Sequence, residues 1–392
     1  MPLWMPIAAI ISGWYVWQWY TRTKFLAKVN PVLLEVKMPR NLVKSPRAME
    51  NALSLLWTDS GETTFLNRVW QGQVRPFFSL EIASFGGEIH FYVWVWKAWR
   101  HVVESAIYAY YPEVEIVEAE DYAMKFKYDP AVHEVFATDW RLEPKNDAYQ
   151  IKTYMDFELE KEIEEEYKID PFAEVLERMS SIKPMEQMWI QILITMSRDK
   201  THVKGTPWWE TTARWNALIH HEIDSIREHS LGDYKEEEWR RYSRMPQPGP
   251  AEAILGMDRN LTKHPFNFGA RGVYISDSKN FNGPTVTGLR WIWRPMGNQE
   301  VGNQLRPRRW GNIFDWPWQD LFDKRWVLHH RRFFDAFRRR SWFYQPWIMP
   351  HNMVSTEMIA TIWHPPSNAI EAPGLRRIPA KRKEAPPNLP KE

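Results

Sequence analysis

The order in which hydrophobic periodicity changes over residues 32–122 limits the folds open to this chain more than any other feature of the sequence. Residues 32–40 (VLLEVKMPR) have the alternating pattern of a strand. Ser45 then offers a helix N-cap, and Pro46 takes the first helical position, where its missing N–H costs nothing. The pattern therefore predicts a strand and then an amphipathic helix, whose apolar stripe is Met49, Leu53 and Leu56.

A hairpin and a second helix–strand pair complete this half of the chain. Two alternating runs meet at Gly86-Gly87, and a Gly-Gly pair between such runs predicts a tight hairpin turn. From Lys97 the period changes to 3.6, and Pro112 ends that helix. Residues 113–122 predict one more strand. The order β-α-β-β-α-β is that of the split βαβ, or ferredoxin-like, unit.

The chain begins with a stretch that has no charged residue before Arg22. A helix over residues 3–20 is about 27 Å long, close to the thickness of a thin hydrocarbon core. A transmembrane anchor, an interfacial helix and a soluble or cleaved segment all fit this stretch, and the anchor is the preferred interpretation. The predicted anchor residues are Leu3, Ile7, Ile10, Ile11, Trp14, Trp17, Trp19 and Tyr20, and the positive-inside flank is Arg22, Lys24 and Lys28. This flank predicts a single-pass inner (cytoplasmic) membrane protein with the bulk of the chain in the cytoplasm.

The second half repeats the pattern. A strand is expected over 149–159, a helix begins at Asp170-Pro171, and a strongly apolar strand follows it. After a largely helical interruption, residues 266–278 resume a strand. The predicted fold class is α+β, with an N-terminal transmembrane helix followed by two tandem ferredoxin-like (βαββαβ) units. The predicted boundaries are 3–20 for the transmembrane helix, 30–125 for the first unit, 146–362 for the second unit with its insertion at about 200–262, and 365–392 for a Pro-rich basic tail.

The sequence contains no recognisable catalytic motif. It has no cysteine, which excludes disulfides, thiolate metal sites and cysteine nucleophiles. The phosphate-binding, dinucleotide-binding, H-E-x-x-H and G-x-S-x-G signatures are also missing. We interpret the pairs His220-His221 and His329-His330 as surface or inter-subunit histidines, because adjacent positions on a helix do not converge on one ion. We therefore expect no enzymatic activity, no cofactor and no metal site.

One segment, residues 306–347, combines cations and aromatic rings. This mixture suits single-stranded nucleic acid, which needs cations for phosphates and rings for bases. It also suits a lipid surface, and it suits a helix whose aromatic residues belong to the core or to a protein interface. All three interpretations stay open. The arginines of the candidate nucleic-acid or lipid patch are Arg306, Arg308, Arg309, Arg331, Arg332, Arg338, Arg339 and Arg340.

Several longer strings resemble a known family. They are VLLEVKMPR…KSPRAMENAL, SLEIASFGGEIHFYV, VESAIYAYYPEVEIVEAEDY, DPFAEVLERMSSIKPMEQMWIQILI and FNFGARGVYIS. They are similar to an uncharacterised bacterial domain that usually precedes a type IV secretion or conjugative-transfer ATPase of the VirB-type or HerA-like kind. The resemblance covers roughly residues 30–390, and the Trp-rich region 290–347 departs from it.

The resemblance implies a function that the residues alone do not. In this family the ATPase domain supplies the nucleotide chemistry, and here the chain ends where that domain would begin. It implies a non-enzymatic, membrane-anchored accessory or assembly subunit that docks a separate VirB-type or HerA-like ATPase at the membrane. The alternative is a single-stranded DNA-binding subunit that guides the transferred strand. The expected partners are that ATPase, membrane lipids, DNA and further subunits of an oligomeric assembly.

Overall fold

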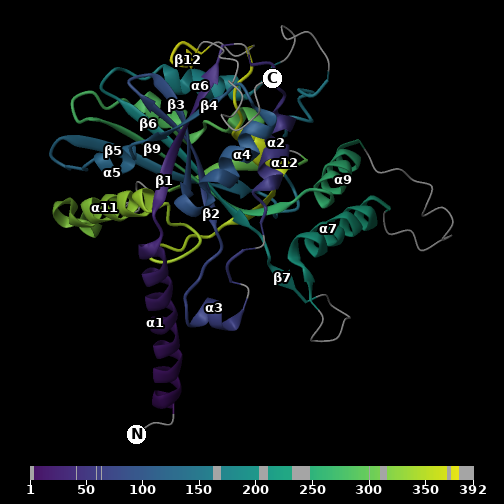
Figure 1. Ribbon diagram of the computed structural model, residues 1–392, viewed down its shortest axis with the longest axis horizontal. Helices are drawn as coiled ribbons and strands as arrows, with labels where there is room; N and C mark the ends of the chain where they lie inside the picture. The colour runs from purple at the N-terminus through teal and green to yellow at the C-terminus, as the bar shows by residue number, and fades with distance from the viewer. Residues whose placement is uncertain are drawn as a thin grey trace, which may run out of the picture.

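The computed structural model describes residues 4–40, 42–58, 60–62, 64–161, 169–202, 211–231, 248–299, 301–309, 316–368 and 372–378. These residues form an α+β fold around one large, mostly antiparallel sheet, and a long N-terminal helix projects from it (Figure 1).

The first half of the chain supplies one end of the sheet. Its elements are α1 (Trp4–Lys28), β1 (Pro31–Pro39), α2 (Pro46–Leu55), α3 (Phe65–Val69), β2 (Phe77–Phe85), β3 (Glu88–Trp96), η1 (Lys97–Trp99), α4 (Arg100–Tyr110), β4 (Glu115–Ala119) and α5 (Tyr122–Lys125). The strands lie in the order β4–β1–β3–β2, and every neighbouring pair is antiparallel. Gly86 and Gly87 join β2 to β3 with φ angles of 59° and 92°, the left-handed backbone that a two-residue hairpin turn needs.

The second half supplies the other end. Its elements are β5 (His133–Glu143), α6 (Phe172–Ser180), β6 (Gln187–Met196), β9 (Pro265–Asp277), α10 (Gly283–Arg290), η3 (Arg294–Met296), β10 (Gln304–Arg309), η4 (Pro317–Gln319), η5 (Leu321–Asp323), α11 (Lys324–Arg338), β11 (Asn352–Ser355), α12 (Thr356–Ile362) and β12 (Arg377–Ile378). Strands β10, β5, β9 and β6 are antiparallel neighbours in that order. β6 then pairs with β2 along its whole length, so the strands of both halves form one continuous sheet. β11 pairs with β9, and the short β12 runs parallel to β1 at the far edge.

The strand predicted over 149–159 is wrong. This stretch forms turns, in which the amides of Asp156 and Leu159 donate to carbonyls only three and five residues earlier. Its apolar side chains still enter the core, for example Tyr154, which is 1% exposed. The strand that opens the second half is instead β5, which pairs with β9 on one side and β10 on the other. The pattern of apolar residues predicted that their side chains are buried, but it did not distinguish a β-strand from a series of turns.

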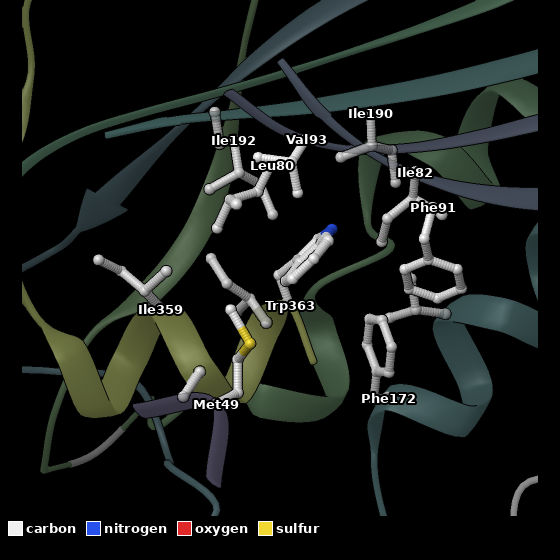
Figure 2. Close-up of a cluster of buried hydrophobic side chains, with 14 of the residues drawn as sticks. Met49, Leu80, Ile82, Phe91, Val93, Phe172, Ile190, Ile192, Ile359 and Trp363 are labelled. Carbon is white, nitrogen blue, oxygen red and sulfur yellow. The ribbon is translucent and has the colours of Figure 1, made fainter. Parts of the chain in front are cut away.

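Helices cover one face of the sheet and enclose the main core. Trp363, which follows α12, lies at the centre of this core and has no exposed surface. Figure 2 shows Trp363 between the sheet above and the helices below. The labelled neighbours are Met49 from α2, Leu80 and Ile82 from β2, Phe91 and Val93 from β3, Phe172 from α6, Ile190 and Ile192 from β6, and Ile359 from α12. Its indole N–H donates to the carbonyl of Glu81 at 3.3 Å, which fixes the ring against β2.

The insertion between β6 and β9 forms a small lobe at the side of the sheet (Figure 1). Its described elements are β7 (Lys200–Thr201), β8 (Thr212–Ala213), α7 (Arg214–Leu231) and α9 (Pro248–Leu261). α7 and α9 pack through a cluster of their own that includes Trp215, Ile219 and Met257. Two cations join the lobe to the body: Arg259 pairs with Asp156 at 2.6 Å, and Lys263, just after α9, pairs with Glu50 at 2.5 Å.

The predicted transmembrane helix is wrong, and with it the inner-membrane location and the fold class that included it. Residues 4–28 do form one helix, α1, but no helix in the described part of the chain is both long enough and apolar enough to span a bilayer. The mean hydropathy of α1 is low because many of its large side chains are Trp and Tyr, whose polar N–H and O–H groups make them less hydrophobic than Leu or Ile. Gln18, in the middle of the helix, lowers it further.

Candidate functional site

The face of the sheet opposite the main core carries a buried row of polar side chains. The members, one per strand from β5 to β3, are Asp139, Arg271, Gln191, Glu81 and Tyr92. Each residue is the registered partner of the next, so their side chains point to the same face. All are less than 9% exposed, although they sit in otherwise apolar strands. We call this set the polar row.

Arg340 closes the centre of the polar row from above. It follows α11, adopts φ 50°, and is fully buried. Its Nε donates to Glu81 Oε1 at 2.9 Å and its Nη2 to Glu81 Oε2 at 3.1 Å, while Asp121 accepts two further hydrogen bonds from the same guanidinium. Glu81 also accepts from Tyr122 and Ser79, both at 2.7 Å. Arg340 and Glu81 therefore each have several partners, which is the condition for burying a charge at all.

Arg271 holds the end of α11 from the sheet side. Its Nε donates to Gln191 Oε1 at 2.8 Å, and its terminal nitrogens donate to the carbonyls of Ala336 and Ser341 at 2.8 and 3.3 Å. Burial lowers the pKa of Arg271 to about 10, so its guanidinium stays charged at neutral pH. The two arginines together attach residues 336–341 to the polar row.

An open cleft of about 250 Å³ lies beside these arginines, between the sheet, the C-terminal end of α1 and residues 338–346. Phe77, Trp94 and Trp96 form its sheet wall, and Leu26 of α1 closes one side. The ring of Phe77 stacks on Trp94 with centroids 5.4 Å apart and meets Trp96 edge-on at 5.7 Å. We call this the aromatic cleft. A largely apolar concavity with a few polar groups is the usual form of a small-molecule site.

A large apolar surface lies on the projecting part of α1 and on the neighbouring α3 (Figure 1). Trp14 stacks on Phe65 with ring centroids 6.4 Å apart, and Trp17 meets Trp70 edge-on at 5.3 Å. Trp17 Nε1 also donates to the carbonyl of Val69 at 3.2 Å. The α1–α3 surface consists of Met5, Ile7, Ile10, Ile11, Trp14, Tyr15, Val16, Trp17, Trp19, Tyr20, Phe65, Leu66 and Trp70, each at least 38% exposed. An apolar patch of this kind marks an interaction site.

The predicted anchor residues make up most of this surface. Ile7, Ile10, Ile11, Trp14, Trp17, Trp19 and Tyr20 all belong to it, and Leu3 lies outside the described residues. The predicted flank lies where α1 reaches the body of the protein. Arg22 lies 3.8 Å from Glu62, Lys24 sits 5.7 Å from the ring of Tyr20, and Lys28 is exposed at the helix end.

The structure distributes the α11 arginines of the predicted patch over different environments. Arg340 is buried in the polar row, and Arg338 donates to two backbone carbonyls at the end of α5. Arg331, Arg332 and Arg339 are exposed. The aromatic residues between them do not share that exposure: Phe333, Phe334 and Phe337 are all buried against the sheet. The exposed arginines Arg331 and Arg332 and the buried rings therefore occupy opposite sides of this helix.

The remaining arginines of the patch lie on β10. Arg306 is the registered partner of Arg141 on β5, and Arg308 faces Asp139. Burial lowers the pKa of Arg141, and the nearby charge of Arg308 lowers it further. The side chain of Arg309 and the whole of Trp310 lie outside the described residues. Two like charges in register cost stability unless an anion lies near them.

The two histidine pairs lie in different environments. His220 and His221 are exposed on α7, whereas the His330 ring is buried and its Nδ1 lies 3.0 Å from the carbonyl of Trp326. Within the described ranges, no three histidine or carboxylate side chains converge to hold a metal ion.

The glycines of NFGARGVY lie in β9 and are each covered by a tryptophan ring. β9 pairs in register with both neighbours across this stretch. Gly269 lies against the indole ring of Trp342 and Gly272 against that of Trp140, on opposite faces of the strand. Glycine is present because two flat rings occupy the space of a Cβ.

Sequence reasoning missed the polar row, but a signal for it exists. Glu81, Gln191 and Arg271 each place a long polar side chain at the middle of a mostly apolar strand. A polar side chain in a buried strand needs a partner, and the partner here comes from a distant segment.

Two comparisons with known proteins were negative. The chain matches no model of a protein family, and a search of curated proteins returns no match.

Proposed function

We propose that this chain is a non-enzymatic assembly subunit that docks a separate P-loop ATPase of the VirB-type or HerA-like kind. The machine would be a type IV secretion or conjugative DNA-transfer-like system. The α1–α3 surface is the observation that carries the proposal. A helix that is apolar all round is normally covered, and here Ile10 is 73% exposed and Ile7 60% exposed.

The choice of an ATPase as the partner is supported by the sequence resemblance over residues 30–390. Docking through α1 and α3 also suits the shape of the fold, since α1 projects from the body while its C-terminal part packs on the sheet (Figure 1). Thr21 is 6% exposed, and Phe25 and Leu26 pack against the apolar cluster on the face of the sheet opposite the main core. The surface is therefore presented on a fixed element, which lowers the entropy lost on binding.

The test is co-purification of the tagged full-length chain with the P-loop ATPase encoded nearest to it. Ile10→Asp and Trp70→Asp each place a charge on the α1–α3 surface at an exposed position, so the fold should be kept. We expect each to weaken the complex at least about tenfold, as loss of a central apolar contact does. Leu255→Asp is the matched control, because Leu255 is 65% exposed on α9, away from that surface. The proposal fails if no complex forms, or if the three variants bind alike.

A second candidate function is supported by the β10 edge. Arg306 and Arg141 face each other there, and the charges of Glu143, Asp139 and Asp147 near Arg141 offset part of their repulsion. Arg306 and Arg308 are two cations along β10 that an anionic strand would contact. Binding of single-stranded DNA should then be salt-sensitive and should weaken in Arg306→Gln/Arg308→Gln. Arg227→Gln, on α7, is the control. Equal binding by both variants, or none by the parent chain, would remove this candidate.

A further inference from the structure

We propose that the aromatic cleft is a binding site for a small amphiphilic carboxylate, a molecule with an apolar body and one anionic head. This site is separate from the α1–α3 surface and does not depend on the proposed docking function. Four features of the cleft lead to this ligand class: its size, its walls, its unpartnered polar atoms and its charge.

The size of the cleft limits how much of a ligand it buries. Its volume is about 250 Å³. Since one water occupies about 30 Å³ in the liquid, the cleft encloses roughly eight non-hydrogen atoms. That is the range of a medium-chain or single-ring carboxylic acid.

The walls fit the apolar body of such a molecule. Phe77, Trp94 and Trp96 present ring faces and edges, and Leu26 and Val29 add aliphatic contact from the C-terminal end of α1. Each of the three rings is less than 9% exposed, so their positions are fixed before any ligand arrives.

Several lining residues carry a buried polar atom with no hydrogen-bond partner within the described part of the chain: two indole donors, the hydroxyl of Thr23 and the amide oxygen of Gln345. Trp96 and Trp342 line the cleft and are 7% and 2% exposed, yet neither indole N–H has a hydrogen-bond partner within the described part of the chain. A buried N–H of this kind normally finds an acceptor. The indole of Trp342 lies on Gly269 of β9, so the N–H of Trp96 is the donor that the oxygen of a bound carboxylate would approach.

The charges of the lining have a single sign. Arg338 and Arg339 belong to the cleft wall, and no Asp or Glu does among the described residues. Arg338 is half-buried and held by backbone carbonyls, whereas Arg339 is exposed and pairs with Asp335 at 2.8 Å, outside the lining. An anionic head therefore complements the cleft, and a cationic head does not.

The experiment is calorimetric titration of the full-length chain with octanoate, compared with octanol, which has the same chain and no charge. We expect octanoate to bind about tenfold more tightly than octanol, because the head forms charge-assisted hydrogen bonds. Ala27→Trp should abolish octanoate binding, since Ala27 is an exposed residue of α1 that lines the cleft. Ala9→Trp is the matched control on the projecting part of α1 and should bind as the parent does.

A spectroscopic readout locates the ligand independently. In spectra of isotope-labelled tryptophan side chains, octanoate should shift the indole N–H signal of Trp96, assigned with Trp96→Phe. Arg339→Gln should weaken binding, and Arg332→Gln, an exposed arginine outside the lining, should not. The proposal is overturned if octanoate gives no heat, if octanol binds as tightly, or if Ala27→Trp leaves the affinity unchanged. None of these outcomes bears on ATPase docking, which is measured on a different surface.

Discussion

The guanidinium of Arg340 makes two hydrogen bonds to the carboxylate of Glu81, at 2.9 and 3.1 Å, although the two residues are far apart in the chain and neither side chain has any exposed surface. This pair fixes the end of α11 on the face of the sheet that carries the polar row. It also fixes the start of the segment 341–346, which forms one wall of the aromatic cleft.

Arg340→Met should destabilise the fold strongly, because it leaves the buried carboxylate of Glu81 without its cation. Removing one partner of a buried ion pair costs about 3–5 kcal/mol. Urea unfolding followed by circular dichroism measures the change. Arg339→Met is the control: this neighbour pairs with Asp335 at the surface, and its loss should cost at most about 0.5 kcal/mol. Equal effects of the two substitutions would contradict the role given to Arg340.

Gly269→Ala should destabilise the protein by about 1–3 kcal/mol, the usual cost of overpacking. The new Cβ would overlap the indole ring of Trp342, which is rigid and 2% exposed. Gly256→Ala, in α9, has no atom within 4 Å of its new Cβ and should be neutral or stabilising. Thermal unfolding of the two variants should therefore move in different directions, and a stabilised Gly269→Ala would contradict the packing described for β9.

Gly72→Ala should loosen the attachment of α1. Gly72 has φ 65°, and an added Cβ would overlap the backbone of Thr21 and Arg22, where α1 joins the body. Limited trypsin digestion reports the effect, since release of α1 exposes the bonds after Arg22, Lys24 and Lys28. Gly13→Ala, on the projecting part of the helix, meets no atom within 4 Å and should be cleaved at the parental rate. An unchanged cleavage rate in Gly72→Ala would show that the close contact between Gly72 and the backbone of Thr21 and Arg22 does not hold α1 in place.

The pair Glu35–His90 should give stability a specific pH dependence. A hydrogen bond from His90, at 2.7 Å, lowers the pKa of Glu35 below its ordinary value of 4.5, and the charge of His90 adds to this. Because the carboxyl binds its proton more weakly in the folded state, its contribution is present above pH 4.5 and is lost as the pH falls through the folded pKa. The difference in the free energy of unfolding between the parent and Glu35→Gln should therefore shrink as the pH falls below 4.5. A difference that grows on acidification would reverse the sign of the proposed coupling.

Local patterns in the sequence predicted most of the first half correctly. The alternation over 32–40 predicted β1, and the N-cap Ser45 does accept from the amide of Arg47 at 3.1 Å. The Gly86-Gly87 pair predicted the hairpin of β2 and β3. These features depend on residues that are close in the chain, so hydrophobic period and backbone freedom are sufficient to determine them.

Local patterns were misleading where an apolar stretch had two possible destinations. The opening helix was predicted to enter a membrane, and the strand predicted over 149–159 is a run of turns. In both places the residues were correctly identified as apolar. What covers an apolar side chain is decided by segments that are distant in the sequence, not by the residues next to it in the chain.

By itself, the sequence determined the period, the turns and the caps, and hence the α+β class of the chain. Only the tertiary structure decided that both halves share one sheet, that Arg340 reaches Glu81, and that Trp342 lies on Gly269. The physical reason is that a buried charge or a ring against a glycine requires a specific distant partner. Such a pairing leaves no periodic signal in either segment, only a long polar side chain or a glycine within a mostly apolar strand.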